Sequence, residues 1–432
     1  MTPKSGKSRP RNRKGNMSSK DAASVRMYDV GFGDCFLVRV PTREGVRKIL
    51  FDCGSLKKGA VPIGEVVRQV IEDARDADGV SRLDVVVATH RHRDHISGFA
   101  DPAWADVRVQ EVWMPWTEDP EDTDVKRIRD FHNRLASRLA STLEARATAS
   151  LNAEEKERLQ LMHAFALNSL TNESAMRTLQ SGFAGRPERR YLPRENTPLA
   201  RLETPALPDV TVQIMGPSRS ADDIEDLNPP AGEHYLRLAE SLEGGGEKAP
   251  CPFGSDWQME PGEYASDYGD LANALTSRDR DAFRDAGSGF DEGVALALDK
   301  VLNGTSLMIV LQVGGATLLF PGDAQWGTWR RALENDECRR ILTDTRFYKV
   351  GHHGSHNATP VDFVEKVVGR DFWAMISTCG IAQWPDIPKK ELLEALRGKT
   401  QRMARSDRPE ESSGDKSFAS EGRFVIEAIV PI

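Results

Sequence analysis

The sequence lacks three features that would place the protein in a membrane or outside the cell. No apolar run approaches the about 18 residues that a membrane-spanning helix needs, so we expect no membrane segment. The start of the chain has no apolar segment of the kind found in secretory signals. The cysteines stand singly and without CxxC spacing, which argues against a disulfide framework and a zinc ribbon: Cys35, Cys53, Cys251, Cys338 and Cys379. We therefore expect a protein of the reducing cytoplasm.

Charge is distributed unevenly along the 432 residues. The first 20 residues contain seven Lys or Arg and no acidic residue, although the whole chain carries a net charge of −8. Because this segment has too few apolar residues to offset its ordering entropy, residues 1–22 are predicted to form a disordered basic tail. Two interpretations of the tail remain: it contacts nucleic acid, or it is simply solvated. The acidic remainder of the chain does not favour non-specific DNA binding.

Patterns typical of strands and helices alternate over most of the chain. Residues 83–90, LDVVVATH, form a continuous apolar run, which predicts a strand buried on both faces. Residues 63–77 have apolar positions at helical spacing and predict a helix. The other predicted strands cover 27–40, 48–55, 107–115, 211–218, a hairpin over 305–323, a strand from 346, 372–380, 400–407 and 422–430, and further helices cover 324–336, 360–368 and 388–398. This mixture predicts an α/β fold.

Two segments interrupt the mixed pattern. Residues 120–182 are charged, rich in Ala and Leu and nearly free of Gly and Pro, which predicts two long helices over about 124–149 and 153–181. Residues 219–300 are rich in Gly, Asp, Pro and Ser and predict a loop-rich segment. We therefore expect one domain over 23–432 that carries a mainly helical insertion (120–208) and a loop-rich insertion (219–302). Either insertion is a candidate docking surface for a protein partner.

Histidine and aspartate residues cluster where the predicted strand 83–90 ends. The stretch THRHRDHISG places His90, His92, Asp94 and His95 within six positions. Imidazole and carboxylate groups are ligands of zinc and manganese, and an extended loop directs His90 and His92 towards one ion and Asp94 and His95 towards another. This pattern predicts a centre with two divalent metal ions.

Further candidate ligands follow two later strands. Asp323 in FPGD is placed to bridge two ions, and KVGHHGSHN offers His352, His353 and His356. Taken alone, Asp323 is also suited to cap the helix predicted over 324–336, and HHGSH is compatible with an ordinary polar loop. The metal interpretation is favoured because all three clusters follow predicted strands.

The motifs resemble the metallo-β-lactamase fold superfamily, in which HxHxDH follows a buried strand. DVGFGD (29–34), FDCG (51–54), PGD (321–323), KVGHHGS (349–355) and ISTCG (376–380) resemble, in the same order, motifs in the soluble domain of the ComEC-type DNA-uptake competence proteins. The resemblance covers about 27–115, 209–218 and 303–407, and both insertions lie outside it.

The resemblance implies an αββα four-layer sandwich with two metal ions at the sheet edges. Carried over by position, the metal ligands are His90, His92, Asp94, His95, Asp323 and His352, with Asp323 bridging the two ions. Asp52 corresponds to an early aspartate that orients the metal loop by hydrogen bonds.

Two departures from the family pattern affect the expected site. Many superfamily members supply another histidine ligand in a segment that corresponds here to NGTSL (303–307), which contains none. One ion is then held through water, Asn303 or an insertion residue. The segment IAQWPDIP (381–388) also lacks the histidine found after ISxG in the competence proteins, which places its role in substrate binding in doubt.

Two cations that share a carboxylate lower the pKa of a bound water and suit displacement at phosphorus. The function expected from the residues is therefore a zinc- or manganese-dependent phosphodiesterase or nuclease, with Asp94, His353 and Lys349 as catalytic residues. In this expectation His353, His356 or Lys349 binds phosphate or protonates the leaving group. For Lys349 the alternative is a strand-end lysine without a catalytic role. For the protein there are two alternatives: hydrolysis of a carboxylic ester, lactone or thioester, and a non-catalytic module that binds a partner.

Overall fold

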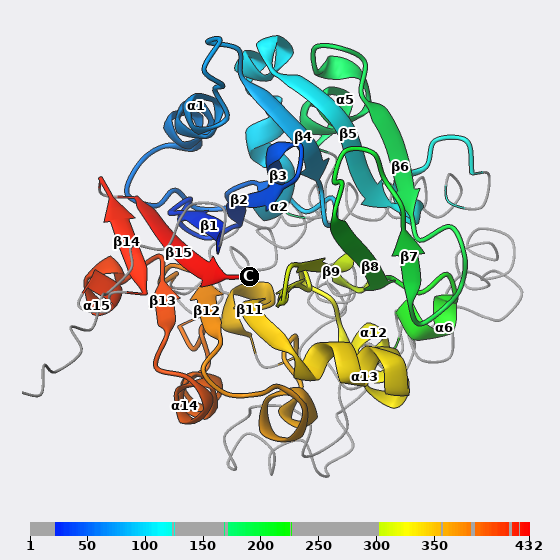
Figure 1. Cartoon of the computed structure of the whole chain (residues 1–432), viewed down its shortest axis with the longest axis vertical. Coiled ribbons are helices and arrows are strands. Elements are labelled where there is room, and N and C mark those ends of the chain that lie inside the picture. The colour runs from blue at the N-terminus through cyan, green and yellow to red at the C-terminus, as the bar shows by residue number, and fades with distance from the viewer. Residues whose placement is uncertain are drawn as a thin grey trace, which may run out of the picture.

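The computed structural model describes residues 22–122, 125, 168, 172–224, 226, 302–355, 357–381, 385–413, 417–422 and 424–432. Within these residues the chain forms a mixed α/β structure with two sheets and several helices (Figure 1), which agrees with the predicted α/β class. The first 21 residues and most of the two predicted insertions lie outside the described residues, and so do His132, His163, His234 and His356.

The first sheet contains, in the described part of the chain, eight strands in the order β14-β15-β1-β2-β3-β4-β5-β6. These are β1 (Ala22–Tyr28), β2 (Cys35–Thr42), β3 (Gly45–Cys53), β4 (Arg82–Val87), β5 (Arg108–Pro115), β6 (Glu188–Leu192), β14 (Phe418–Glu421) and β15 (Val425–Pro431). Strand β4 pairs in parallel with both β3 and β5. Its residues Val85, Val86 and Val87 are buried, as the apolar run predicts for a strand covered on both faces.

The second sheet contains, over the same described residues, seven strands in the order β13-β12-β11-β10-β9-β8-β7. These are β7 (Ala200–Leu202), β8 (Val210–Gly216), β9 (Met308–Val313), β10 (Ala316–Phe320), β11 (Thr345–Lys349), β12 (Trp373–Ile376) and β13 (Met403–Arg405). Strands β10 to β13 are parallel to one another, so their carboxyl ends lie at one edge of the sheet.

Three apolar clusters hold the sheets and helices together. The first contains side chains from both sheets, including Phe51 of β3 and Phe320 of β10, whose rings stack with centroids 4.0 Å apart. The second packs helix α1 against the first sheet, and the third packs helices α12 to α14 against the second sheet. The described helices are α1 (Ile63–Asp73), α2 (Arg93–Ile96), α5 (Glu173–Arg177), α6 (Ala221–Ile224), α12 (Trp326–Glu334), α13 (Asp336–Thr343), α14 (Lys390–Lys399) and α15 (Pro409–Ser413).

The structure differs from the sequence-based elements around two chain segments on either side of the sheet interface and, as described below, within the helical insertion. The strand predicted over 27–40 is divided into β1 and β2 by a turn that includes Gly31 and Gly33. Gly31 has φ +82°, and a Cβ atom on Gly33 would lie 2.3 Å from the carbonyl oxygen of Gly54, so both positions require glycine. The helix predicted over 324–336 corresponds to α12, and a second helix that was not predicted, α13, follows it after Asn335, which is extended and caps α13 through its side chain.

The described part of the predicted helical insertion contains strands as well as helix. Residues 173–182 are helical, as predicted, but β6 and β7 also lie within 120–208 and belong to the two different sheets. Residues 188–202 therefore extend the edge of each sheet, and the chain crosses from one sheet to the other between β6 and β7.

We predict that Phe320→Ala lowers the free energy of unfolding by about 3–5 kcal/mol, because it removes a fully buried ring that stacks on Phe51 between the sheets. Denaturant titration followed by far-ultraviolet circular dichroism measures the change. Val46→Ala serves as the control because Val46 is 51% exposed. Equal losses in the two variants would contradict the assignment of Phe320 to the core.

Candidate metal centre

The loop after strand β4 brings two histidine side chains together. His90 and His92 are both buried, and His90 Nε2 lies 3.0 Å from His92 Nδ1. His92 is extended, with φ −60° and ψ 149°, and directly precedes helix α2. The two imidazoles therefore contact each other, but neither belongs to the groups of three or more potential metal ligands found among the described residues.

A second group assembles from three separate segments. Asp94, His95, Asp323 and His353 each offer a ligand atom, and these four atoms lie within 4.8 Å of one another. His95 Nε2 is 3.0 Å from Asp323 Oδ2, and His353 Nε2 is 3.0 Å from Asp94 Oδ2. All four side chains are buried. This buried His/Asp group can coordinate a metal ion.

The HHGS loop places its two histidines differently. His353 is buried, and because its Nδ1 donates to the carbonyl oxygen of Ser377 (2.9 Å), its Nε2 faces Asp94. The side chain of His352 is 18% exposed, and its Nε2 lies 4.0 Å from Asp323 Oδ2. The sequence analysis assigned metal binding to His352 and catalysis to His353. In the structure His353 belongs to the group of four, and His352 lies beside it.

The backbone around the HHGS loop is unusual. His352 and His353 have φ values of +45° and +53°, in the left-handed region that side chains other than glycine rarely occupy. Asp52, which contacts the same cluster, has φ +54°. Left-handed non-glycine residues cost free energy and are found where the surrounding structure holds a functional group in place.

Asp323 follows strand β10 and is directed towards the cluster. Its Oδ1 accepts from the backbone N–H of His352 (3.0 Å), while its Oδ2 faces His95. The alternative in which Asp323 caps the following helix is wrong, because the N-cap of α12 is Gln325 and no side chain caps it. Gly322, with φ +57°, lets the chain pass closely over Thr89 and Leu307.

Asp52 connects the metal loop to strand β3. Its carboxylate accepts from the backbone N–H and the hydroxyl of Thr89, both at 2.7 Å, and faces His95 Nδ1 at 2.8 Å. These hydrogen bonds fix the start of the loop and leave His95 Nε2 to face Asp323. The structure therefore shows the hydrogen bonds that the family resemblance implies for Asp52.

The electrostatics of the cluster suit a cation. Burial lowers the pKa of His90 well below its usual value and that of His92 to about 4, so both imidazoles are neutral and able to act as ligands. Burial opposes the charge on Asp323, but His95 and Lys349 outweigh it and hold the pKa of that carboxyl well below its usual value.

Asp94 Oδ1 is buried and has no hydrogen-bond partner among the described residues. A buried carboxylate oxygen without a donor fits a metal ligand.

Sequence reasoning missed one acidic residue of the cluster. Asp34 is buried, and its carboxylate forms an ion pair with Lys349 and lies 3.6 Å from His95 Nδ1. Together with Asp52 and His95 it forms a second group of potential ligands. The signal was present in DVGFGD, where an aspartate follows two glycines and precedes a buried strand, but nothing in the sequence showed which way it faces.

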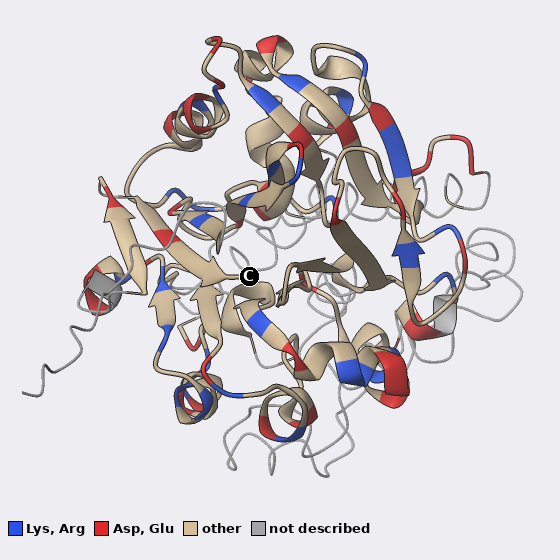
Figure 2. Cartoon of the chain, in the orientation of Figure 1, with Lys and Arg blue, Asp and Glu red and all other residues tan. Residues whose placement is uncertain are grey.

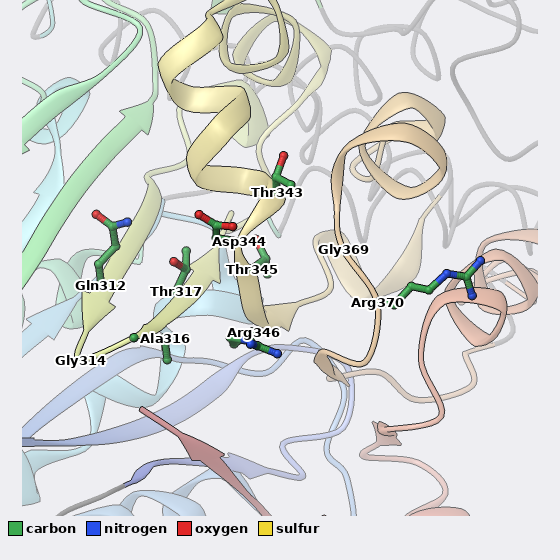
Figure 3. Close-up of a pocket in the computed structure, with 11 residues that line it drawn as sticks. Gln312, Gly314, Ala316, Thr317, Thr343, Asp344, Thr345, Arg346, Gly369 and Arg370 are labelled. Atoms are coloured by element: carbon green, nitrogen blue, oxygen red, sulfur yellow. The ribbon is translucent and has the colours of Figure 1, made fainter.

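A cavity of about 360 Å³ lies at the opposite end of the second sheet (Figure 3). It is lined by Thr317 and Thr345, near the starts of β10 and β11, whereas Asp323 and Lys349 lie at or beyond the ends of these strands. Its Arg370 donates to the carbonyl oxygen of Gly398 and extends away from the other labelled side chains. The cavity is thus separate from the His/Asp cluster.

Comparisons with models of known protein families and with curated proteins find no match to this chain. A two-sheet α/β structure with a buried His/Asp cluster is nevertheless compatible with a metal-dependent hydrolase. Among the described parts of the chain, no helix combines the length and the apolar character needed to span a membrane.

We predict that Asp52→Asn weakens zinc binding by about 10- to 100-fold, because an amide N–H in place of a carboxylate oxygen opposes the proton on His95 Nδ1. Asparagine tolerates the left-handed backbone at this position, so the variant tests the hydrogen bond and not the fold. Zinc titration against a chromophoric chelator measures the affinity. Asp84→Asn, at a half-buried carboxylate held by the Arg47 side chain and the backbone N–H of Lys48, is the control. Equal zinc affinities in the two variants would refute the role of Asp52.

Proposed function

We propose that this chain is a dinuclear metal-dependent hydrolase of the metallo-β-lactamase fold superfamily, acting on phosphodiesters. The observation that carries the proposal is the convergence of Asp94, His95, Asp323 and His353 from loops that follow β4, β10 and β11. These segments contain three of the motifs by which the sequence resembles the superfamily. Structural coincidence does not readily explain why four ligand-type side chains from three motifs meet in one buried cluster.

The arrangement of sheets and helices supports the proposed fold. Side chains of both sheets share one apolar cluster, while helix α1 covers the first sheet and helices α12 to α14 cover the second. An αββα sandwich requires this distribution, since each sheet buries one face against the other sheet and one against helices. The proposed site then lies at the edge where the loops after β4, β10 and β11 meet.

We assign the ligands to two ions. His90 and His92 would hold the first, Asp94, His95 and His353 would hold the second, and both ions would share Asp323. This assignment replaces His352 by His353, because the Nε2 atom of His353 lies 3.0 Å from Asp94. Zinc and manganese both suit imidazole and carboxylate ligands. When bound, two such ions supply Lewis acidity and an activated water for attack at phosphorus.

His352 is then available for the substrate. Its side chain is 18% exposed, and Ser355 Oγ lies 2.9 Å from its Nδ1. Ser355 in turn donates to Asn357, whose side-chain amide donates to Gln325. Because Ser355 gives its only hydroxyl proton to Asn357, His352 Nδ1 donates to Ser355 Oγ, and only the imidazolium form of His352 presents an Nε2–H to a phosphoryl oxygen or to the leaving group.

The segment NGTSL also supports the proposed site, although it lacks a histidine. Leu307 donates its backbone N–H to the carbonyl oxygen of Thr89, and Ser306 Oγ accepts from the N–H of Asp323. Asn303, which the sequence analysis named as a candidate ligand, is buried. The segment is therefore hydrogen-bonded both to Thr89, at the start of the loop that contains His90 and His92, and to Asp323.

The charge distribution bears on the class of phosphodiester. Figure 2 shows basic and acidic residues interspersed on the described helices and strands in this view. Non-specific binding of a long polyanion relies on many basic side chains gathered on one surface. We therefore assign recognition of the substrate phosphate to the metal cluster and His352. For the same reason the assay below includes a small phosphodiester as well as nucleic acid.

We predict that the metal-loaded protein hydrolyses a bis-aryl phosphodiester and that a chelator and Asp94→Ala each abolish the turnover. Asp94 contributes a carboxylate oxygen that has no other partner in the described structure, so its loss removes a ligand. The assay compares the diester, a lactone and plasmid DNA, each with zinc and with manganese. Asp362→Asn, at a half-buried aspartate that pairs with Arg339 of helix α13, is the control.

Three results would contradict the proposal in different ways. Turnover of the lactone alone would indicate a carboxylic ester hydrolase. Metal binding without turnover of any substrate would indicate a partner-binding module that retains the metal. Diester turnover that persists in Asp94→Ala would show that the cluster is not the reacting centre.

A further inference from the structure

Lys349 is the only lysine or arginine side chain that the described structure places in contact with the bridging aspartate. It ends strand β11 and is 3% exposed. Its ammonium group forms an ion pair with Asp34, lies 3.4 Å from Asp323 Oδ1, and donates to the carbonyl oxygen of Gly322 at 3.3 Å. An ammonium group has three N–H donors, and here three acceptors surround it. No donor is left for a substrate phosphate.

Asp34 lies behind the two histidines of the second ligand group. Its carboxylate oxygens are 3.6 Å from His95 Nδ1 and 3.8 Å from His353 Nδ1. Both of these Nδ1 atoms have closer partners, Asp52 and the carbonyl oxygen of Ser377. The Asp34 carboxylate therefore depends on Lys349 for its nearest opposite charge.

The backbone of Asp34 is attached to the same loops. Its N–H donates to the carbonyl oxygen of Asp94 (2.9 Å), and its own carbonyl oxygen accepts from Gly54 (3.0 Å). A Cβ atom on Gly33 would lie 2.6 Å from the carbonyl oxygen of Asp94, so this close approach requires glycine. The position of Asp34 is thus fixed relative to the metal loop, and through Lys349 it is connected to β11 in the other sheet.

We propose that Asp34 and Lys349 are positioning residues that hold the Asp323 carboxylate for metal binding, and that Lys349 does not contact substrate. Lys349 engages Oδ1 of Asp323 and leaves Oδ2 facing His95. The inference rests on the proposed function for the identity of the centre, but it concerns metal affinity and does not require hydrolysis.

Removing either partner leaves a buried charge without its counter-charge. In Lys349→Met, the Asp34 carboxylate competes for the Nδ1 protons of His95 and His353, and Asp323 loses the contact at Oδ1. In Asp34→Asn, the ammonium is drawn to Asp323 alone and competes with the metal for that carboxylate. In Asp34→Asn/Lys349→Met, no buried charge is left unpaired.

The test measures zinc affinity by titration against a chromophoric chelator for the wild type, both single variants and the double variant. We expect each single variant to bind zinc about 10- to 100-fold more weakly. The factor by which the double variant weakens zinc binding should be smaller than the product of the factors measured for the two single variants. The KM for the bis-aryl phosphodiester should stay unchanged at saturating zinc, because Lys349 has no donor free for substrate.

Lys48→Met is the matched control. Lys48 is half-buried and, like Lys349, pairs with an aspartate, Asp76, but it lies on β3 and makes no contact with the cluster among those described. It should change stability and leave zinc affinity unchanged. Zinc affinity in Lys349→Met equal to that of the wild type would overturn the inference, and a raised KM in the same variant would return Lys349 to substrate binding.

Failure of a single variant to fold does not remove the test. If Lys349→Met does not fold, Asp34→Asn carries the test, and a zinc affinity of Asp34→Asn equal to that of the wild type would overturn the inference. A wild-type protein that binds zinc without hydrolysing a phosphodiester would refute the proposed function alone. A wild-type protein that binds neither zinc nor manganese would refute both.

Discussion

The structure depends on the compensation of buried negative charge. Asp34, Asp52, Asp94 and Asp323 are all buried and surround the rings of His95 and His353. A carboxylate removed from water is stable only when donors or cations replace its hydration. Backbone and side-chain N–H groups satisfy Asp52, and Lys349 neutralises Asp34, but one oxygen of Asp94 has no donor in the described residues. This arrangement explains why the cluster is suited to a divalent cation.

The packing of the two sheets determines where these charges meet. Phe51 and Phe320 stack between the sheets, one residue before Asp52 and three before Asp323. Strand ends on both sides of this apolar contact therefore face each other at one edge. The left-handed backbone of Asp52, His352 and His353 is held there by the surrounding strands and hydrogen bonds. Rigid sheets thus fix the positions of side chains that a free loop would not hold.

Much of this arrangement could be predicted from the sequence, because strand ends and ligand-type residues are local signals. The apolar run LDVVVATH predicted a strand buried on both faces, and the cluster from His90 to His95 follows the end of that strand, β4. The position of Asp323 after β10 was predicted by the same reasoning.

Other features were not predictable because they depend on contacts distant in the sequence. The choice between His352 and His353 depends on two left-handed residues, and no pattern in HHGS indicates which ring then turns inward. The burial of Asp34 and its ion pair with Lys349 join residues from different sheets. The division of 27–40 into two strands depends on the approach of Gly33 to Gly54, which a local alternation of apolar residues does not reveal.

The distances along the chain between the clustered residues also affect how the protein matures. Asp94 and His353 contact each other across 259 positions, and His95 and Asp323 across 228. Residues 90–95 leave the ribosome well before Asp323 and His353 do, and the first sheet itself is completed only when β15 pairs with β1. The group of four potential ligands therefore forms only after β11 and its loop have been made. A metal ion held by this group would thus bind late, and an unfinished chain would carry an incomplete set of ligands.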